Sequence, residues 1–442
     1  MSVTDPLLNE EAPPLHKRCT VQQTLLALLA LQLGWGLWLL PHAFSLLGWV
    51  PALTAVGCVA LTTAYSGGLF TRLFLATPGT VLFGDIAEAA GGPSARALCY
   101  TIVYTLDGTR CVILHLAATQ SLEHALGSAA PPLWQCGLIV LVVAAIASQI
   151  RALSELSGFF LLGTTAQLIG IGIVIYQLLT EPDPDAKHAA FVKPGTGDAT
   201  VESQFVAFFN IIFAYGGQFA FVELMTSMVK PSRFPIAIST CTAIMTALYA
   251  SLAAIGYQSK GSAVAEIVIF SLGDGPHARF AAACILVQAL SQYLVNTNVW
   301  SHNLLVLVQR RLTDADGAAV VVGRRENQAA AVPRCSSDHA RLPWAAATVF
   351  VVTYSYLFSM SVPYFSTLVG IVASSTYLVC AYTLPCWFAL RLFPTEMGAV
   401  QRAACRAAIP VTLLLSAAGF VCSVSTLIRQ IREGGSAFGP PV

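Results

Sequence analysis

Eleven windows of mostly apolar residues dominate the sequence. Each is close to the length of about 20 residues that an α-helix needs to cross the hydrocarbon core of a bilayer. Only 10% of the 442 residues are charged, whereas a soluble globular chain carries about 25%. The sequence therefore predicts an all-α polytopic membrane protein and argues against a soluble enzyme or a nucleic-acid-binding protein. The windows lie near 22–45, 49–71, 96–126, 133–150, 157–180, 202–229, 236–258, 278–309, 343–360, 364–390 and 408–428.

The basic residues between the windows predict the orientation of the chain, because Lys and Arg concentrate in cytosolic loops. If the N-terminus is cytosolic, 16 of the 23 basic residues fall on the cytosolic side and six on the other, with Arg110 inside a span. Eleven spans and a cytosolic N-terminus therefore support each other. We expect the protein in the plasma membrane or in a vacuolar or lysosomal membrane.

The windows divide the chain into two sets of five helices and one additional helix. The expected order is a cytosolic N-terminal tail at 1–20, a first five-helix repeat at 21–180, an extracytosolic loop at 181–201, a second five-helix repeat at 202–390 that contains a flexible cytosolic loop at 313–342, and an eleventh helix with the C-terminal tail at 391–442.

Glycines interrupt the first and the sixth windows at matching positions. Gly34 and Gly36 flank Trp35 in the first window, and Gly216-Gly217 follows Tyr215 in the sixth. Glycine in a helix interior costs about 1 kcal/mol relative to alanine, and irregular backbone at membrane depth is tolerated where it is buried in protein or lines a cavity. Broken helices at corresponding positions of two halves are typical of inverted-repeat transporters. Close helix packing would account more simply for one such glycine pair, but not for two.

The breaks also predict the chemistry of a ligand. Unwinding frees backbone N–H groups at the start of the second half-helix, where the helix dipole is positive. A carboxylate would be held there without an arginine, and the freed carbonyl groups would hold an ammonium group. An amino acid offers both ends. The predicted substrate-binding residues are Gly34, Trp35, Gly36, Asp107, Tyr215, Gly216 and Gly217.

Several motifs in the expected order resemble the amino acid/auxin permease family, and one stretch is similar to its lysine/histidine transporter branch. The motifs are GWGLWLLPHAF at 34–44, FAYGG at 213–217, MVKP at 228–231, SVPYF at 361–365 and TLPC at 383–386, with ATQSL at 118–122 for the branch. The resemblance implies a LeuT-like 5+5 inverted repeat in which helices 1 and 6 are discontinuous. It also implies secondary active transport of amino acids, usually by proton symport.

An ionisable residue within a window indicates a compensating partner or a function, because it costs about 2.5–3.5 kcal/mol at mid-membrane on insertion scales. Asp107 and Arg110 are three residues apart on one helix face, so they form a local ion pair or leave Asp107 to hold the substrate ammonium or the coupling proton. Glu223 matches a glutamate that recurs in the family, and a buried carboxyl there would be a proton carrier or a strut for the unwound backbone. His42 is the third proton-coupling candidate.

A polar strip in the eighth window includes Ser291 and Asn296, which are the candidate cation site against the first helix. The strip contains no acidic residue, which favours proton coupling over sodium coupling. The 12 cysteines are scattered without a CxxC pair, so we expect no metal and no cofactor.

Two other functions fit the same residues. An auxin-like organic-anion carrier would use the same helix N-terminus, and an aromatic cavity without an acidic side chain would favour it. An amino-acid sensor with little flux would signal through 313–342. A membrane enzyme would need a nucleophile or a cluster of His, Asp or Cys at one face, and the sequence has none.

Overall fold

The apolar windows form helices because a bilayer offers no partner to the backbone polar groups, so each segment must satisfy its own. The computed structural model describes residues 19–150, 153–183, 200–315 and 341–434. In these ranges the one strand-like contact is an isolated bridge between Cys19 and Met228. The predicted tail at 1–20 and the loops at 181–201 and 313–342 lie mostly outside the described residues.

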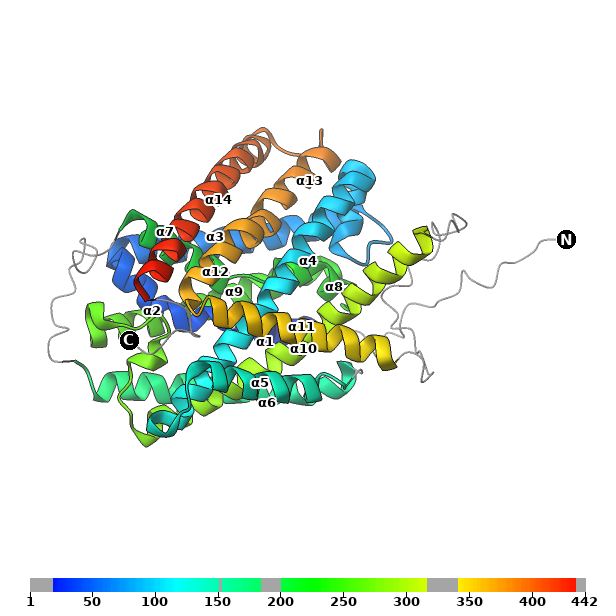
Figure 1. Cartoon of the computed structure of the whole chain (residues 1–442). Helices are drawn as coiled ribbons and strands as arrows, with labels where there is room; N and C mark the ends of the chain where they lie inside the picture. The colour runs from blue at the N-terminus through cyan, green and yellow to red at the C-terminus, as the bar shows by residue number, and fades with distance from the viewer. Residues whose placement is uncertain (1–18, 151–152, 184–199, 316–340, 435–442) are drawn as a thin grey trace.

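The helices lie side by side as a bundle (Figure 1). Short 3₁₀ helices connect several of them, and two π-helices, Ala373–Tyr377 and Val379–Thr383, join α12 to α13. The α-helices are α1 (Val21–Gln32), α2 (Gly36–Leu47), α3 (Trp49–Ala76), α4 (Phe83–Leu126), α5 (Leu133–Ala147), α6 (Leu153–Thr180), α7 (Val201–Ala214), α8 (Phe221–Thr226), α9 (Phe234–Lys260), α10 (Pro276–Ala315), α11 (Arg341–Ser361), α12 (Phe365–Val372), α13 (Leu384–Leu392) and α14 (Ala399–Gly434).

The number of spans is close to the predicted eleven. Nine helical segments of the described chain are long and apolar enough to cross a membrane, and the bent pair α1–α2 makes a tenth. The fourth predicted window corresponds to α5, which is apolar but has only 15 residues. By length alone, the count of eleven is therefore not confirmed.

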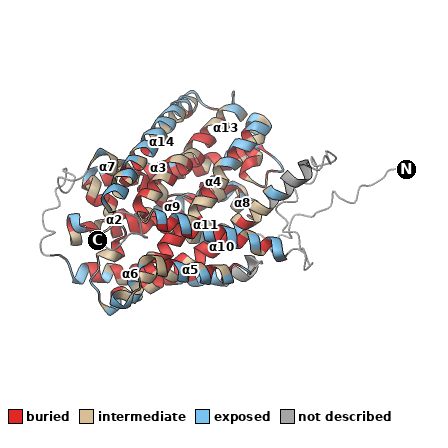
Figure 2. Cartoon of the chain, viewed as in Figure 1, coloured by how far each residue is buried: buried red, intermediate tan, exposed pale blue. Residues whose placement is uncertain are grey.

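Large apolar side chains cover the outer faces of the bundle. Leu61, Leu161 and Leu414 are each at least 70% exposed, and Figure 2 shows buried residues gathered in the interior, with exposed ones along the outer helices. Apolar residues all around a helix are typical of a membrane span, where lipid takes the place of a protein core. Inside the bundle, α10 packs against α4 and α6, and α2 packs against α7 and α9.

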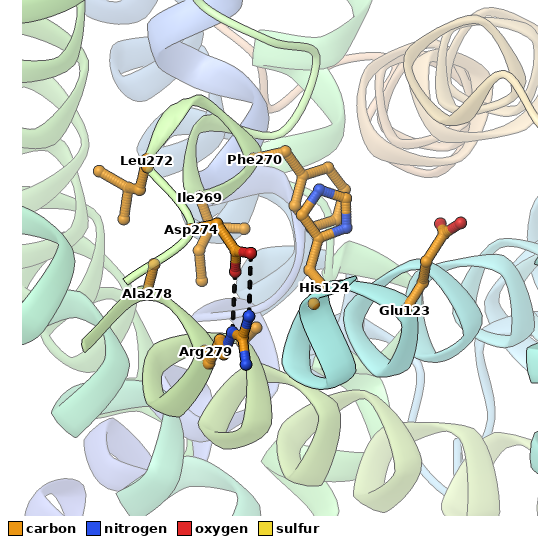
Figure 3. Close-up of a pocket in the computed structure, with 11 residues that line it drawn as sticks. Glu123, His124, Ile269, Phe270, Leu272, Asp274, Ala278 and Arg279 are labelled. Carbon is orange, nitrogen blue, oxygen red and sulfur yellow. Dashed lines mark hydrogen bonds and ion pairs between the residues drawn. The ribbon is translucent and has the colours of Figure 1, made fainter. Parts of the chain in front are cut away.

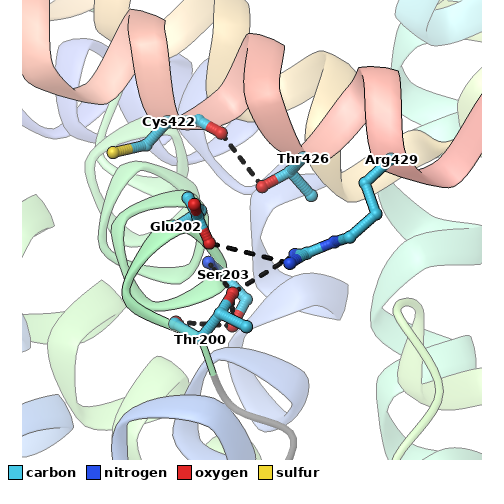
Figure 4. Close-up of polar contacts among 6 residues, drawn as sticks. All are labelled: Thr200, Glu202, Ser203, Cys422, Thr426 and Arg429. Carbon is cyan, nitrogen blue, oxygen red and sulfur yellow. Dashed lines mark hydrogen bonds and ion pairs between the residues drawn. The ribbon is translucent and has the colours of Figure 1, made fainter.

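The helix α14 lies at the edge of the bundle and is joined by polar contacts to the start of α7 (Figure 4). A guanidinium nitrogen of Arg429 lies 3.7 Å from a Glu202 carboxylate oxygen, and another donates to Thr200 Oγ1 over 3.2 Å. Thr200 in turn caps α7 by accepting from the Ser203 N–H. An exposed ion pair of this kind contributes about 0.2–1 kcal/mol, so it fixes position more than it adds stability.

Candidate functional site

Both predicted helix breaks are present. The axes of α1 and α2 meet at 59°, with Leu33, Gly34 and Trp35 outside regular helix. The second break separates α7 from a short 3₁₀ helix and α8, and it contains Tyr215, Gly216 and Gly217. Gly217 has φ of 156°, within the range that favours glycine.

The two breaks lie against each other. A Cβ on Gly36 would collide with the Cα of Ala214 and lie 2.8 Å from its Cβ. A Cβ on Gly217 would lie 2.8 Å from Gln32 Nε2, and one on Gly216 would collide with the ring of Tyr377. The glycines are therefore needed for close approach, because the start of α2 packs directly on the end of α7.

One hydroxyl group from an unbroken helix joins the two breaks. Tyr249, on α9, is fully buried, and its Oη lies 3.0 Å from the Gln32 carbonyl oxygen and 2.9 Å from the Ala214 carbonyl oxygen. These two carbonyls end α1 and α7, where the last turn has no intrahelical donors. Tyr249 therefore satisfies both helix ends with one shared hydrogen.

Two glutamine side chains satisfy further groups of the unwound backbone. Gln218 Oε1 accepts from the Gly217 N–H at 2.9 Å, and its Nε2 donates to the Tyr215 carbonyl at 3.1 Å. Gln167, on α6, donates from Nε2 to the Gly34 carbonyl at 3.5 Å. Both side chains are almost fully buried, so in the described structure they supply hydrogen bonds that water would otherwise make.

A cavity lies between the two breaks. Its volume for the centres of water molecules is about 30 Å³, which is room for about two waters. An amino acid does not fit this space, so the structure has a closed site. The lining residues are Leu31, Gln32, Gly34, Trp35, Gly36, Arg110, Ile113, Leu114, Phe213, Ala214, Gly216, Gln292 and Tyr377.

Arg110, on α4, is the charged side chain of this lining. Its guanidinium carbon lies 5.0 Å from the ring centroid of Phe219, which is within the range of a cation–π contact. In the ranges that the structure describes, the guanidinium has no hydrogen bond and no carboxylate within 4.0 Å. The sequence predicted a carboxylate site that needs no arginine, but the cavity contains one.

Asp107 lies one helical turn before Arg110 but is not among the lining residues. Its side chain is buried, and its Oδ2 accepts a long hydrogen bond of 3.4 Å from Asn303 Nδ2 on α10. No ion pair within 4.0 Å joins Asp107 to Arg110 in the described structure, so the local pair considered from the sequence does not form. Of the predicted substrate-binding residues, the cavity brings together Gly34, Trp35, Gly36 and Gly216.

Four other predicted residues lie outside the lining, and one of them is Gly217 in the second break. The Tyr215 hydroxyl lies 2.9 Å from Thr246 Oγ1. His42 lies with Nδ1 2.9 Å from the Val264 carbonyl oxygen. Glu223 is exposed, so the burial that the sequence argument assumed for it is not found. Among the described residues no hydrogen bond joins its side chain to the unwound segment, whereas Gln218 bonds that segment at two positions. The proton-carrier and strut roles of Glu223 stay predictions.

The candidate cation site consists of side chains that bond within their own helix. Ser291 Oγ donates to the Val287 carbonyl, and Asn296 Nδ2 donates to the Gln292 carbonyl. The Gly34 carbonyl, which would complete a cation site on the first helix, already accepts from Gln167. This carbonyl also accepts from the Leu37 N–H at 3.4 Å, whereas the side-chain oxygens of Ser291 and Asn296 keep acceptor capacity.

A larger cavity of about 290 Å³ lies between the end of α4, the 3₁₀ helix Val268–Ser271 and the start of α10 (Figure 3). His124 stacks on Phe270 with ring centroids 3.7 Å apart. Arg279 donates to Asp274 through two nitrogens at 2.8 and 2.9 Å, and this hydrogen bonding lowers the pKa of the Asp274 carboxyl. The guanidinium here is thus paired, unlike that of Arg110. Among the described residues, no group of three His, Cys, Asp or Glu is placed to hold a metal ion.

Sequence reasoning missed the side chains that stabilise the breaks. The partners of Tyr249 and Gln167 are 35 to 217 residues away, so no local pattern connects them. A buried glutamine in the apolar run TTAQLIG at 164–170 was a usable signal, because a polar amide inside a span needs a partner.

Comparisons with known proteins agree with this architecture. The model of a family described as transmembrane amino acid transporter protein matches residues 17–429. Amino acid transporter AVT1D from Arabidopsis thaliana is 24% identical over 98% of this chain and 74% of its own. Lysine histidine transporter-like 7 from the same plant is 28% identical over 47% of this chain and 45% of its own.

The crystal structure of MhsT in complex with L-phenylalanine has a TM-score of 0.53 and 14% identity, and it covers 90% of this chain and 98% of that one. The predicted all-α, LeuT-like fold is thereby confirmed, and so is the resemblance to the amino acid/auxin permease family. The relatives are transporters and not enzymes. From its family match and its paired helix breaks, the chain belongs to the transmembrane amino acid transporter protein family.

Proposed function

We propose that the protein is a secondary active transporter that moves amino acids across a membrane by proton symport. The observation that carries the proposal is the cavity between two broken helices, which supplements the membership of an amino acid transporter family. The site would be the cavity at Gly34, Trp35, Gly36 and Gly216.

In this proposal each end of an amino acid has its own partner. The cavity lies at the N-terminus of α2, where the dipole is positive and the Leu37 and Trp38 N–H groups donate to the Gly34 and Trp35 carbonyls over 3.4 and 3.2 Å. A carboxylate would bind there. The ammonium group would bind the Ala214 carbonyl oxygen at the end of α7, which has a lone pair beyond the one that Tyr249 uses, whereas the Gln32 carbonyl also accepts from the Gly34 N–H at 2.7 Å.

The closed cavity fits one state of an alternating-access cycle. With room for about two waters it holds no substrate, so α2 and α7 would have to separate for a substrate to enter. With the N-terminus cytosolic, as the basic residues predict, the transporter would reside in the plasma membrane or in a vacuolar or lysosomal membrane.

Proton coupling is favoured over sodium coupling by two features. The polar strip that contains Ser291 and Asn296 has no acidic residue, and Gln167 already donates to the Gly34 carbonyl. Asp107 is a buried carboxyl one turn from the cavity with a single long hydrogen bond. It is therefore the preferred proton-coupling residue, ahead of Glu223 and His42.

The test is uptake by purified protein in proteoliposomes. A panel of 20 amino acids is offered with an imposed pH gradient, in sodium and in potassium salts. We expect uptake that follows the pH gradient and is equal in both salts. In Asp107→Asn, gradient-driven uptake should be lost while exchange of substrate across the membrane persists. Sodium-dependent uptake, or wild-type gradient-driven uptake in Asp107→Asn, would contradict proton coupling through this residue.

A second candidate function is a carrier of auxin-like organic anions. The lining is aromatic at Trp35, Phe213 and Tyr377, and it has no acidic side chain, which is the condition that favours this carrier. Indole-3-acetate belongs in the same panel. Uptake of indole-3-acetate without uptake of any amino acid would favour this function, and saturable amino acid binding with negligible flux would indicate a sensor.

A further inference from the structure

A single positive charge faces the cavity between the breaks. Of the lining residues in the described chain, Arg110 alone is charged. A guanidinium group carries five N–H donors and stays protonated at all physiological pH values. Its one close contact in the described structure is with the face of Phe219, which leaves the edge of the guanidinium plane with its donors unused.

In the described structure no carboxylate lies within 4.0 Å of the Arg110 guanidinium. Asp107 is the nearest acidic residue on α4, but it is not within 4.0 Å and accepts from Asn303 instead. Phe219 packs edge-on against Tyr377, and so does Phe213. Phe213 and Tyr377 line the cavity together with Arg110, which is partly buried.

The cavity therefore offers two places for negative charge. The first is the N-terminus of α2 at Gly36, where a substrate α-carboxylate binds according to the proposed function. The second is Arg110, on α4, which lines the same cavity. An amino acid with a neutral side chain fills the first place only, whereas one with a side-chain carboxylate fills both and can bond the guanidinium in the bidentate mode.

We propose that Arg110 is a specificity-determining residue, and that the transported substrate is an acidic amino acid whose side-chain carboxylate pairs with the guanidinium. This inference rests on the proposed function and adds the substrate class. Gln292, with its side chain 3.4 Å from the position of a Gly34 Cβ, supplies an uncharged amide donor on the same cavity wall.

The competing role for Arg110 is to bind the α-carboxylate itself. In that case every amino acid would depend on it equally. The two roles differ for pairs of substrates that have the same shape but differ in side-chain charge, namely L-glutamate with L-glutamine and L-aspartate with L-asparagine.

The experiment measures initial uptake of these four radiolabelled amino acids into proteoliposomes. For the wild type we expect at least tenfold faster uptake of glutamate than of glutamine at equal low concentration. In Arg110→Gln, glutamate uptake should fall at least tenfold while glutamine uptake is retained or rises. Arg110→Lys should keep part of the preference, since it keeps the charge but not the planar fork.

Arg279→Gln is the matched control, because it removes an arginine that is paired with Asp274 outside the cavity. It should leave the ratio of glutamate to glutamine uptake unchanged. Equal losses of both substrates in Arg110→Gln would overturn the inference and assign Arg110 to the α-carboxylate.

The wild type provides a readout that does not depend on the variant. Competition of glutamate uptake by unlabelled glutamine should be weak, and a wild type that prefers glutamine would refute the inference even if Arg110→Gln fails to fold. Uptake of neutral amino acids alone would overturn the inference and leave the proposed function intact. A wild type that transports none of the 20 amino acids would defeat the proposed function itself.

Discussion

Replacing Gly36 with alanine tests the contact on which the whole site depends. The added Cβ would collide with the Ala214 Cα and lie 2.8 and 2.9 Å from its Cβ and backbone N. Optimal carbon–carbon contacts are about 3.5–4.0 Å, so α2 and α7 must move apart by about 1 Å. The obstacle is backbone and cannot turn aside as a flexible side chain would.

The expected cost follows from this displacement. Overpacking a tight contact costs about 1–3 kcal/mol, and the better helix propensity of alanine returns at most about 1 kcal/mol. The shift also moves the α2 N-terminus and both carbonyls that Tyr249 joins. We therefore expect Gly36→Ala to lower the thermal unfolding midpoint and to reduce substrate uptake at least tenfold.

Two further variants serve as comparisons. A Cβ on Gly57, in α3, meets nothing within 4 Å, so Gly57→Ala should equal or exceed the wild type in thermal stability and keep its uptake. A Cβ on Gly34 lies 3.4 Å from Gln292 Nε2, the far end of a flexible side chain. Gly34→Ala should fold with less loss of stability than Gly36→Ala.

The assay is thermal unfolding in detergent combined with proteoliposome uptake, and membrane insertion is quantified for each variant. Ala214→Gly added to Gly36→Ala should restore only part of the stability, because the collision with the Cα remains. Wild-type unfolding and uptake in Gly36→Ala would refute the reasoning, since the two half-helices would then not be in contact.

Other predictions concern the side chains that satisfy the unwound backbone. Tyr249→Phe removes the hydroxyl shared by the ends of α1 and α7 and should destabilise the protein by about 1–3 kcal/mol, measured as a lower unfolding midpoint. Tyr65→Phe, at an exposed tyrosine on α3, should change that midpoint by less than Tyr249→Phe does. Gln218→Ala leaves the Gly217 N–H and the Tyr215 carbonyl without their bonds; we expect a lower midpoint and faster hydrogen exchange confined to the second break. An unchanged exchange pattern would show that another group satisfies this backbone.

The positions of the breaks could be predicted from the sequence because glycine is costly in a helix interior, so glycine runs at matching depths of two apolar windows indicate interrupted helices. Local glycine patterns were therefore enough to predict Gly34 and Gly216, which both line the cavity. The approximate places of the spans were predictable for a similar reason, since span length and hydrophobicity are properties of one segment. The boundaries were less so: α4 begins at Phe83 against a predicted 96, and α14 at Ala399 against a predicted 408.

The contacts of the charged side chains could not be predicted as well, because their partners lie on other helices. The spacing of Asp107 and Arg110 left open a local pair or a site role for Asp107; in the structure Asn303 on α10 bonds the first and Phe219 contacts the second. Both of these partners lie on segments other than α4. Glu223 was expected to be buried on the basis of its window, but α8 ends soon after it and leaves the side chain exposed.

In the structure the glycines and the residues that hydrogen-bond the unwound backbone have different roles. Glycines permit the unwound backbone and its close approach, but buried N–H and C=O groups need partners, and these come from Gln167, Gln218 and Tyr249. The hydroxyl of Tyr249 is shared between two carbonyls on different halves of the chain. Separating the halves would leave it bonded to one of them, so opening forfeits about one shared hydrogen bond, a net change of about 1 kcal/mol. A contact of that size holds the site closed and is still small enough for the binding of a charged substrate to offset.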